Sequence, residues 1–215
     1  MNTPYQWDKK IASHLGGTRT SAVISWPARI TAGGLRHQFS HVTDIVPTIL
    51  GAAGIPMPKV IDGVKQVPLN GDSLVYTFDD ADADGRHTTQ YFEVIANQGI
   101  YQDGWMANTP PKRLPWVGMG ESTADPFNEY EWELYNLNDD FTQSRNLAEE
   151  NPEKLEELRQ VFLAEARRNQ VLPLDDRYIE RAIPENRPQH NKGRTLFTLP
   201  ARRQAHLFLR PIPPP

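Results

Sequence analysis

The first apolar stretch of the chain is a short continuous run over residues 21–26, Ser-Ala-Val-Ile-Ser-Trp, which ends at Pro27. A run of this length predicts a strand buried on both faces of a larger sheet. A central strand is not stable without neighbouring strands, and residues 1–20 contain no run that would pair with it. The pattern therefore predicts that the other strands belong to a longer polypeptide.

A helix with defined ends is predicted at about residues 44–54. Asp44 is its expected N-cap, because a carboxylate at this position accepts the unpaired N–H groups of the first turn. Pro47 falls in that turn, where its missing N–H costs little. Gly51 and Gly54 predict where the helix ends. The apolar stripe has helical spacing and consists of Ile45, Val46, Ile49 and Leu50.

Residues 90–137 contain short runs rich in aromatic and β-branched residues, some alternating with a period of two. The strands expected from these runs are residues 90–94, 99–101, 105–107 and 132–137. Asp103 and Gly104 form a two-residue hairpin signal between the second and third runs. The pattern predicts a meander of about four antiparallel strands.

A long helix is predicted at about residues 151–169. Asn151 stands at the expected N-cap, and Pro152 occupies the first helical position, which proline favours. Arg167 and Arg168 near its end suit the helix dipole. Its apolar positions recur at helical spacing and are Leu155, Leu158, Phe162 and Ala166. A helix of this kind would cover one face of the meander, so the predicted fold class is α+β.

Composition narrows the possible functions. The chain has 215 residues, 38% of them hydrophobic, which is typical of a globular protein. Its formal net charge is −4, with acidic and basic residues interspersed, so nothing indicates nucleic-acid binding. No apolar run is long enough to span a membrane, and the first ten residues do not resemble a signal peptide. The compartment therefore stays open.

Metal and thiol chemistry have little support in the sequence. The chain has no cysteine, which excludes disulfides and thiolate ligands. Residues 79–85 form an acidic run, Asp-Asp-Ala-Asp-Ala-Asp-Gly. This run lacks the long ligand loop and the closing glutamate of a calcium hand, so we expect a solvated surface turn.

Five segments, in order, resemble the sulfatase family. They are a Lys…Gly-Gly-x-Arg…Trp-Pro block over residues 9–27, an Asp-x-x-Pro-Thr-x-Leu helix over 41–50, and further stretches at 62–71, 99–105 and 133–148. The resemblance covers about residues 3–180. Its long linking segments and the Leu-Pro-Leu-Asp-Asp-Arg stretch at 172–177 fit the large bacterial arylsulfatase-like branch best. It implies that residues 1–58 end an α/β catalytic domain and that residues 59–183 form a C-terminal subdomain. Residues 184–215 are predicted to be a Pro-rich tail, extended or disordered.

The resemblance also implies a chemistry for the intact enzyme. Sulfatases convert a Cys or Ser to formylglycine, whose hydrate attacks the sulfur of a sulfate ester, and a divalent cation, usually calcium, holds the sulfate. The family's metal-binding acidic pairs and its nucleophile motif have no counterpart in this chain. We therefore expect a C-terminal portion that binds neither cofactor, contains no catalytic residue and is inactive alone.

The family's late lysine, which contacts the sulfate, has two candidates here. An ungapped alignment on Gly16 and Gly17 selects Lys10, whereas the longer spacing of the most similar branch selects Lys9. Either ammonium would serve as a point charge for a tetrahedral anion.

Two further residues are candidate substrate contacts. His14 would line the mouth of the pocket, although a loop histidine is more often structural. Trp116 lies in a Pro/Gly-rich loop and is a candidate aromatic platform, although core packing is the more common role for tryptophan.

Two other patterns resemble catalytic motifs but carry little weight. Residues 25–29 read Ser-Trp-Pro-Ala-Arg, which matches the core of the family's nucleophile motif, yet the sequence that follows departs from the full signature. Ser73, His87 and Asp103 would compose a triad, but no nucleophile-elbow motif supports it.

Two alternative functions remain open at the level of sequence. The chain could be a stand-alone α+β binding module without catalysis. It could also be part of a related phosphoesterase or phosphonate hydrolase, because the residues that choose between sulfur and phosphorus are absent. The sequence does not identify the sulfate ester.

Overall fold

The computed structural model describes residues 3–31, 33–114, 116–118 and 120–183. The chain divides into two compact units, residues 1–178 and 179–215. In the second unit, the described residues contain one 3₁₀ helix, η3 (Ile179–Ala182). The predicted tail, residues 184–215, lies outside the described residues, and the predicted domain boundaries at 58 and 183 stay predictions.

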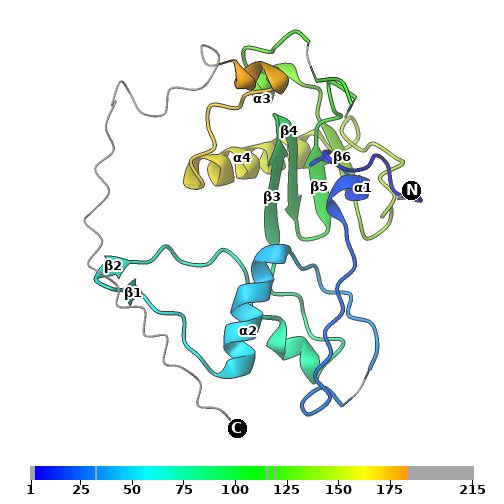
Figure 1. Cartoon of the computed structure of the whole chain (residues 1–215). Helices are drawn as coiled ribbons and strands as arrows, with labels where there is room; N and C mark the ends of the chain where they lie inside the picture. The colour runs from blue at the N-terminus through cyan, green and yellow to red at the C-terminus, as the bar shows by residue number, and fades with distance from the viewer. Residues whose placement is uncertain (1–2, 32, 115, 119, 184–215) are drawn as a thin grey trace. The chain divides into compact units, whose positions relative to one another are not determined.

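The first unit is built around a four-stranded antiparallel sheet in the order β3-β4-β5-β6 (Figure 1). Its strands are β3 (Thr89–Val94), β4 (Asn97–Gln102), β5 (Trp105–Asn108) and β6 (Glu133–Asn136). Two-residue turns join the first three strands, and Asp103 and Gly104 in the second turn have φ angles of 47° and 85°. Positive φ at both positions gives the turn twist that a tight hairpin needs. The predicted meander and its Asp-Gly hairpin are confirmed.

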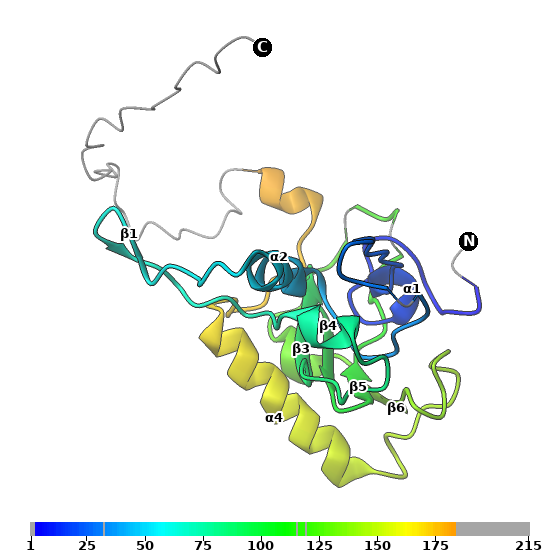
Figure 2. The same cartoon turned by 90° about the horizontal axis from the view of Figure 1, so that it is seen from below.

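The long helix α4 (Pro152–Arg168) packs against the sheet and closes the core (Figure 2). Phe162 is fully buried and stacks on Tyr91, with ring centroids 4.7 Å apart. The buried core cluster consists of Ile100, Ala107, Phe127, Trp132, Leu134, Leu158, Phe162 and Ala166. The predicted α+β architecture, in which a helix covers an antiparallel meander, is confirmed.

The ends of α4 match the sequence prediction only in part. Pro152 occupies the first turn, as expected, and Arg167 and Arg168 lie in the last turn. The side chain of Asn151 makes no capping hydrogen bond, and its Nδ2 donates instead to the carbonyl of Leu147 over 3.4 Å.

The helix α2 (Ile45–Ala53) follows the 3₁₀ turn η1 (Val42–Asp44). The capping role predicted for Asp44 is wrong, because its carboxylate makes no cap bond to α2. It accepts instead from the backbone N–H of His41 (2.7 Å) and of Asp72 (2.8 Å), and it pairs with His87. Gly54 ends the helix with φ 67°, as predicted.

The strand predicted at residues 21–26 does not form. These residues are extended without strand pairing to any described segment, and Val23 is 92% exposed. A strand needs a partner for its ladder hydrogen bonds, and the short second sheet pairs two other segments, β1 (Val60–Ile61) with β2 (Val64–Lys65). The remaining short helices are α1 (Leu15–Thr18), η2 (Leu74–Phe78) and α3 (Pro126–Glu129).

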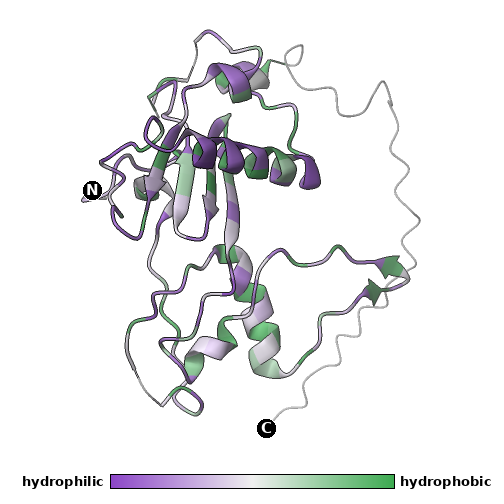
Figure 3. Cartoon of the chain, turned by 180° about the vertical axis from the view of Figure 1, so that it is seen from behind, coloured by the Kyte–Doolittle hydropathy of each residue, from purple (hydrophilic) through white to green (hydrophobic). Residues whose placement is uncertain are grey.

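The helix α2 is apolar over much of its length (Figure 3). Ile45, Val46 and Ile49 are each about half exposed or more. None of the helices in the described segments has both the length and the apolar character needed to span a bilayer.

Candidate functional site

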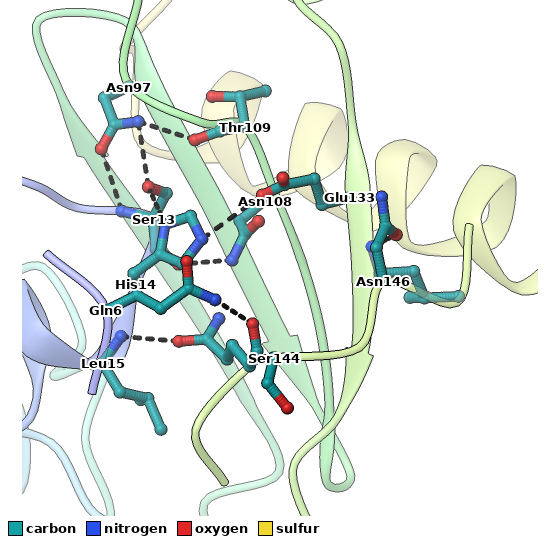
Figure 4. Close-up of polar contacts among 12 residues, drawn as sticks. Gln6, Ser13, His14, Leu15, Asn97, Asn108, Thr109, Glu133, Ser144 and Asn146 are labelled. Atoms are coloured by element: carbon teal, nitrogen blue, oxygen red, sulfur yellow. Dashed lines mark hydrogen bonds and ion pairs between the residues drawn. The ribbon is translucent and has the colours of Figure 1, made fainter. Parts of the chain in front are cut away.

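The segment that carries both candidate lysines is fixed to the sheet by a buried polar network (Figure 4). The amide oxygen of Asn97 accepts from the backbone N–H groups of Ala12 (2.7 Å) and Ser13 (3.0 Å). Its amide nitrogen donates to Ser13 Oγ (3.0 Å) and to the carbonyl of Thr109 (2.8 Å). Asn108 Nδ2 donates to the carbonyl of Ser13 over 2.7 Å. Buried polar groups are stable only when bonded, so this network fixes the segment in place.

His14 belongs to the same network and is only 1% exposed. Its Nδ1 lies 2.8 Å from Ser13 Oγ, and its Nε2 lies 3.3 Å from a carboxylate oxygen of Glu133. The imidazole also packs against the ring of Tyr135, with centroids 6.1 Å apart. This placement gives His14 a role in holding the segment, and a contact between His14 and substrate stays a prediction.

The two glycines after His14 allow the chain to fold back on itself. A Cβ at Gly16 would lie 2.1 Å from the carbonyl oxygen of Gln6, and one at Gly17 would lie 1.9 Å from that of Ile11. Gly16 N–H donates to the same Gln6 carbonyl over 3.1 Å. Only glycine fits such close backbone approaches. The turn leaves Lys9 and Lys10 exposed between its two ends.

Lys10 lines an open pocket of about 490 Å³, a volume that includes the space at its mouth. The cationic lining consists of Lys10, Lys112 and Arg113, and Asp176 is the carboxylate among the lining residues. The remaining wall is formed mainly by Ile11, Val94, Ile95, Asn97, Pro111, Leu114, Val117, Tyr130 and Tyr178. A cationic and otherwise largely apolar lining suits an anion attached to an apolar body.

Aromatic rings support the pocket's charged groups. The Nζ of Lys10 lies 4.5 Å from the ring centroid of Tyr178, which is a cation–π distance. Tyr130 donates its hydroxyl to Asp176 over 2.9 Å. Burial raises the pKa of Tyr130, and the hydrogen bond to Asp176 and the charge of that carboxylate act in the same direction. Tyr130 therefore remains a neutral hydrogen-bond donor at neutral pH.

The structure brings some of the predicted site residues together and separates others. Trp116 is 74% exposed and lies in the loop whose Leu114 and Val117 line the pocket. Lys10 lines the same pocket, whereas Lys9 is exposed beside it and is not among the lining residues. The substrate contacts predicted for Lys9, Lys10, His14 and Trp116 stay predictions.

The sequence reading missed Lys112, Arg113, Tyr130 and Asp176. A cation pair next to Pro110 and Pro111, just after a strand, was the available signal for the first two. Asp176 belongs to the family-like stretch at residues 172–177, but no local pattern indicated its contacts, because the hydroxyl and N–H groups that donate to it lie 46 and 53 residues away along the chain.

The described residues do not assemble the triad that the sequence allowed. His87 Nδ1 pairs with Asp44 Oδ1 at 2.7 Å and not with Asp103. Ser73 Oγ accepts from the backbone N–H of Val75 over 3.4 Å, as a helix cap does. A catalytic dyad requires the nucleophile to lie within hydrogen-bond reach of its base, and no such bond joins Ser73 to His87.

The acidic run is an exposed turn, as predicted, and Asp79 at its start pairs with Arg29. Within residues 3–31, 33–114, 116–118 and 120–183, no group of three or more His, Cys, Asp or Glu side chains could hold a metal ion. The described residues therefore do not fit the calcium that the family resemblance implies. Ser25 lies in extended chain and is exposed.

An antiparallel sheet covered by one helix, with a cationic pocket beside its β3–β4 turn, defines an α+β protein with a site suited to anions. No family model matches the chain. It is 28% identical over 185 residues to an uncharacterized sulfatase of Schizosaccharomyces pombe, covering 82% of this chain and 30% of that protein.

Shorter matches lead to the same family. The chain is 42% identical over 55 residues to N-acetylgalactosamine-6-sulfatase of Canis lupus familiaris, covering 25% of this chain and 10% of that protein. It is 38% identical over 61 residues to human arylsulfatase A, covering 28% of this chain and 12% of that protein. The chain thus spans less than a third of the first relative's length.

Solved structures share the fold. The protein Ps i-CgsB matches with a TM-score of 0.58 and 17% identity, over 85% of this chain and 36% of its own. A Bacteroides thetaiotaomicron protein, from work on a genetic locus for the metabolism of multiple glycosaminoglycans, matches with a TM-score of 0.53 and 19% identity, over 71% of this chain and 30% of its own. The sequence relatives confirm the resemblance to sulfatases, and the solved structures show that the fold is shared.

Proposed function

We propose that this chain is the C-terminal portion of an arylsulfatase-type sulfuric ester hydrolase. In this role it supplies one wall of the substrate cleft and a lysine that contacts the sulfate. The observation that carries the proposal is the position of Lys10, which lies in the family-like Gly-Gly block and also lines the cationic pocket. The similarity to sulfatases over 82% of the chain supports the same reading.

The geometry favours Lys10 over Lys9 for the sulfate contact. Lys10 has φ 78°, an uncommon backbone conformation for a residue other than glycine. Residues held in such conformations tend to occur at functional sites. The loop closed by the Gly16–Gln6 hydrogen bond holds Lys10 in this conformation at the pocket.

The chain alone is proposed to bind a sulfate ester without cleaving it. Formylglycine and calcium belong to the intact enzyme by family resemblance, and the described residues provide no donor set for the metal. Charge in the pocket can hold the ester, but cleavage of the S–O bond requires an activated nucleophile as well.

The proposal is tested by titrating 4-nitrophenyl sulfate into the 215-residue chain and following the aromatic ligand signals by NMR. We expect Lys10→Met to weaken binding by about tenfold, the loss expected for one charge-assisted contact of about 1.4 kcal/mol. Lys9→Met is the matched control and should bind as the wild type does. Equal binding by the Lys10→Met variant would remove the lysine from the proposed site, and a loss confined to Lys9→Met would move the role to that residue.

A further inference from the structure

Part of the pocket wall comes from a loop that follows β5 and precedes α3. Over its described part this loop, residues 112–123, contains no helix or strand. Its two ends meet, because Lys112 Nζ donates to Thr123 Oγ1. A surface segment of this length whose ends lie together is an Ω-loop, a class that is frequently functional.

Asp176 contacts both ends of this loop. Its carboxylate oxygens accept from the backbone N–H of Thr123 over 3.1 and 2.9 Å, and one of them lies 3.8 Å from Lys112 Nζ. The hydroxyl of Tyr130 is a further donor. Asp176 is only 4% exposed. A carboxylate this deeply buried is costly unless it is paired and hydrogen-bonded, so these contacts act as one unit.

The loop fastened in this way carries much of the pocket. Arg113, Leu114 and Val117 line it, and Trp116 lies between the last two. Arg113 Nη2 donates to the carbonyl of Glu121 on the returning arm of the loop. A Cβ at Gly120 would lie 3.1 Å from Arg113 Nε, so the returning arm passes close to this guanidinium. The contacts that join the two ends of the loop therefore also influence where Arg113 lies.

We propose that Asp176 is a positioning residue. Its contacts with Thr123 and Lys112, called the clasp below, hold the two ends of the 112–123 loop together and thereby position Lys112 and Arg113 at the ligand pocket. The proposal rests on the proposed function only for the identity of the ligand, a sulfate ester. Asp176 does not touch the ligand in this account, because its carboxylate would repel an anion. Its effect on binding passes through the loop.

Hydrogen exchange of the folded chain tests the clasp without any ligand. Asp176→Asn should raise the exchange rates of the amides of the described loop residues 113, 114, 116–118 and 120–122 at least tenfold, because the loop then loses the charged partner that joins its ends. Tyr130→Phe removes one donor to Asp176 and should give a smaller rise. Asp175→Asn is the matched control, since Asp175 pairs with Arg177, and it should leave these amides unchanged. Unchanged exchange in both Asp176→Asn and Tyr130→Phe would overturn the clasp.

Ligand affinity separates positioning from simple stability. At a temperature where each variant is fully folded, Asp176→Asn should bind 4-nitrophenyl sulfate at least fivefold more weakly than Asp175→Asn does. A purely structural residue would lower the melting temperature and leave the affinity of the folded protein intact, and that outcome would overturn the proposal. If the wild-type chain binds no sulfate ester, the proposed function fails, and hydrogen exchange alone decides on the clasp.

Discussion

At the scale of single residues, one amide side chain does much to hold the site segment on the sheet. Asn97 makes four hydrogen bonds, which join residues 12 and 13 to residue 109. Each such bond contributes about 1 kcal/mol net, and a buried donor left without an acceptor costs about 1–3 kcal/mol. Much of the free energy that holds residues 12 and 13 on the sheet therefore depends on Asn97.

We expect Asn97→Ala to lower the free energy of unfolding by about 2–4 kcal/mol, because two buried N–H groups lose their acceptor. Urea denaturation followed by tryptophan fluorescence measures this change. Asn128→Ala is the control, since Asn128 is exposed and bonds only locally to Asp125; its effect should stay within about 0.5 kcal/mol. A loss of similar size in both variants would contradict the central place given to Asn97.

The half-buried His41 makes stability depend on pH. Burial lowers the pKa of His41 below its ordinary value, the charge of His87 adds to this effect, and Asp44 opposes it. The unfolded chain therefore binds the proton first as the pH falls. The resulting stability is complete above about pH 6.5, the ordinary histidine value, and it is lost as the pH falls through the lowered pKa of the folded state.

The urea midpoint should accordingly decrease between pH 7.5 and pH 5, and His41→Asn should make this decrease smaller. His37→Asn, a substitution at an exposed position, should leave the slope unchanged. A midpoint that rises as the pH falls would contradict the direction given for His41.

The role of a single residue could be predicted from the sequence where it depends on neighbouring residues in the chain. Gly54 was identifiable as a helix stop because a left-handed residue after a helix favours glycine. Two of the three partners of Asp44, Asp72 and His87, were not identifiable, because they lie 28 and 43 residues away and bond to it only after folding. The same holds for Asp176 and the pocket wall.

At the scale of secondary-structure elements, α4 and the sheet depend on each other through Phe162. This ring is fully buried and contacts Tyr91, Phe127 and Trp132. Phe162→Ala should lower the free energy of unfolding by about 3–5 kcal/mol, through lost burial and the cavity left behind. Glu157→Ala on the exposed face of the same helix should cost less than about 0.5 kcal/mol. Thermal melts compare the two variants. Similar losses of stability in Phe162→Ala and Glu157→Ala would contradict the assignment of the buried face of α4.

Elements with strong local periodicity were predictable from the sequence, and elements that need distant partners were not. The β4–β5 hairpin carries its own turn signal and α4 its own apolar periodicity, and both elements formed as expected, although the side chain of Asn151 does not cap α4. The run at residues 21–26 has strand-like composition, yet no described segment pairs with it. The apolar character of a segment indicates a preference for burial, and the available partners decide whether a strand forms.

At the scale of the whole molecule, several large apolar side chains remain in contact with solvent. Those most exposed are Val23 (92%), Val67 (82%), Leu35 (78%), Trp116 (74%) and Val42 (67%). Ile45 and Ile49 on α2 are also exposed. Extended apolar surface of this kind favours association or dye binding.

We expect the purified chain to bind a hydrophobic dye such as ANS, and the double substitution Ile45→Lys/Ile49→Lys should reduce the bound-dye fluorescence by about half. The melting temperature should change little, because both side chains are already exposed. Undiminished dye fluorescence in the double variant would mean that the dye binds elsewhere.

We propose that this chain holds a sulfate ester through a cationic pocket and does not cleave it. The most direct measurement is an NMR time course of 4-nitrophenyl sulfate with the purified 215-residue chain and calcium. We expect the aromatic ligand signals to broaden on mixing while the ester stays intact over hours. Accumulation of free 4-nitrophenol, or ligand signals that are unaffected by the chain, would contradict it.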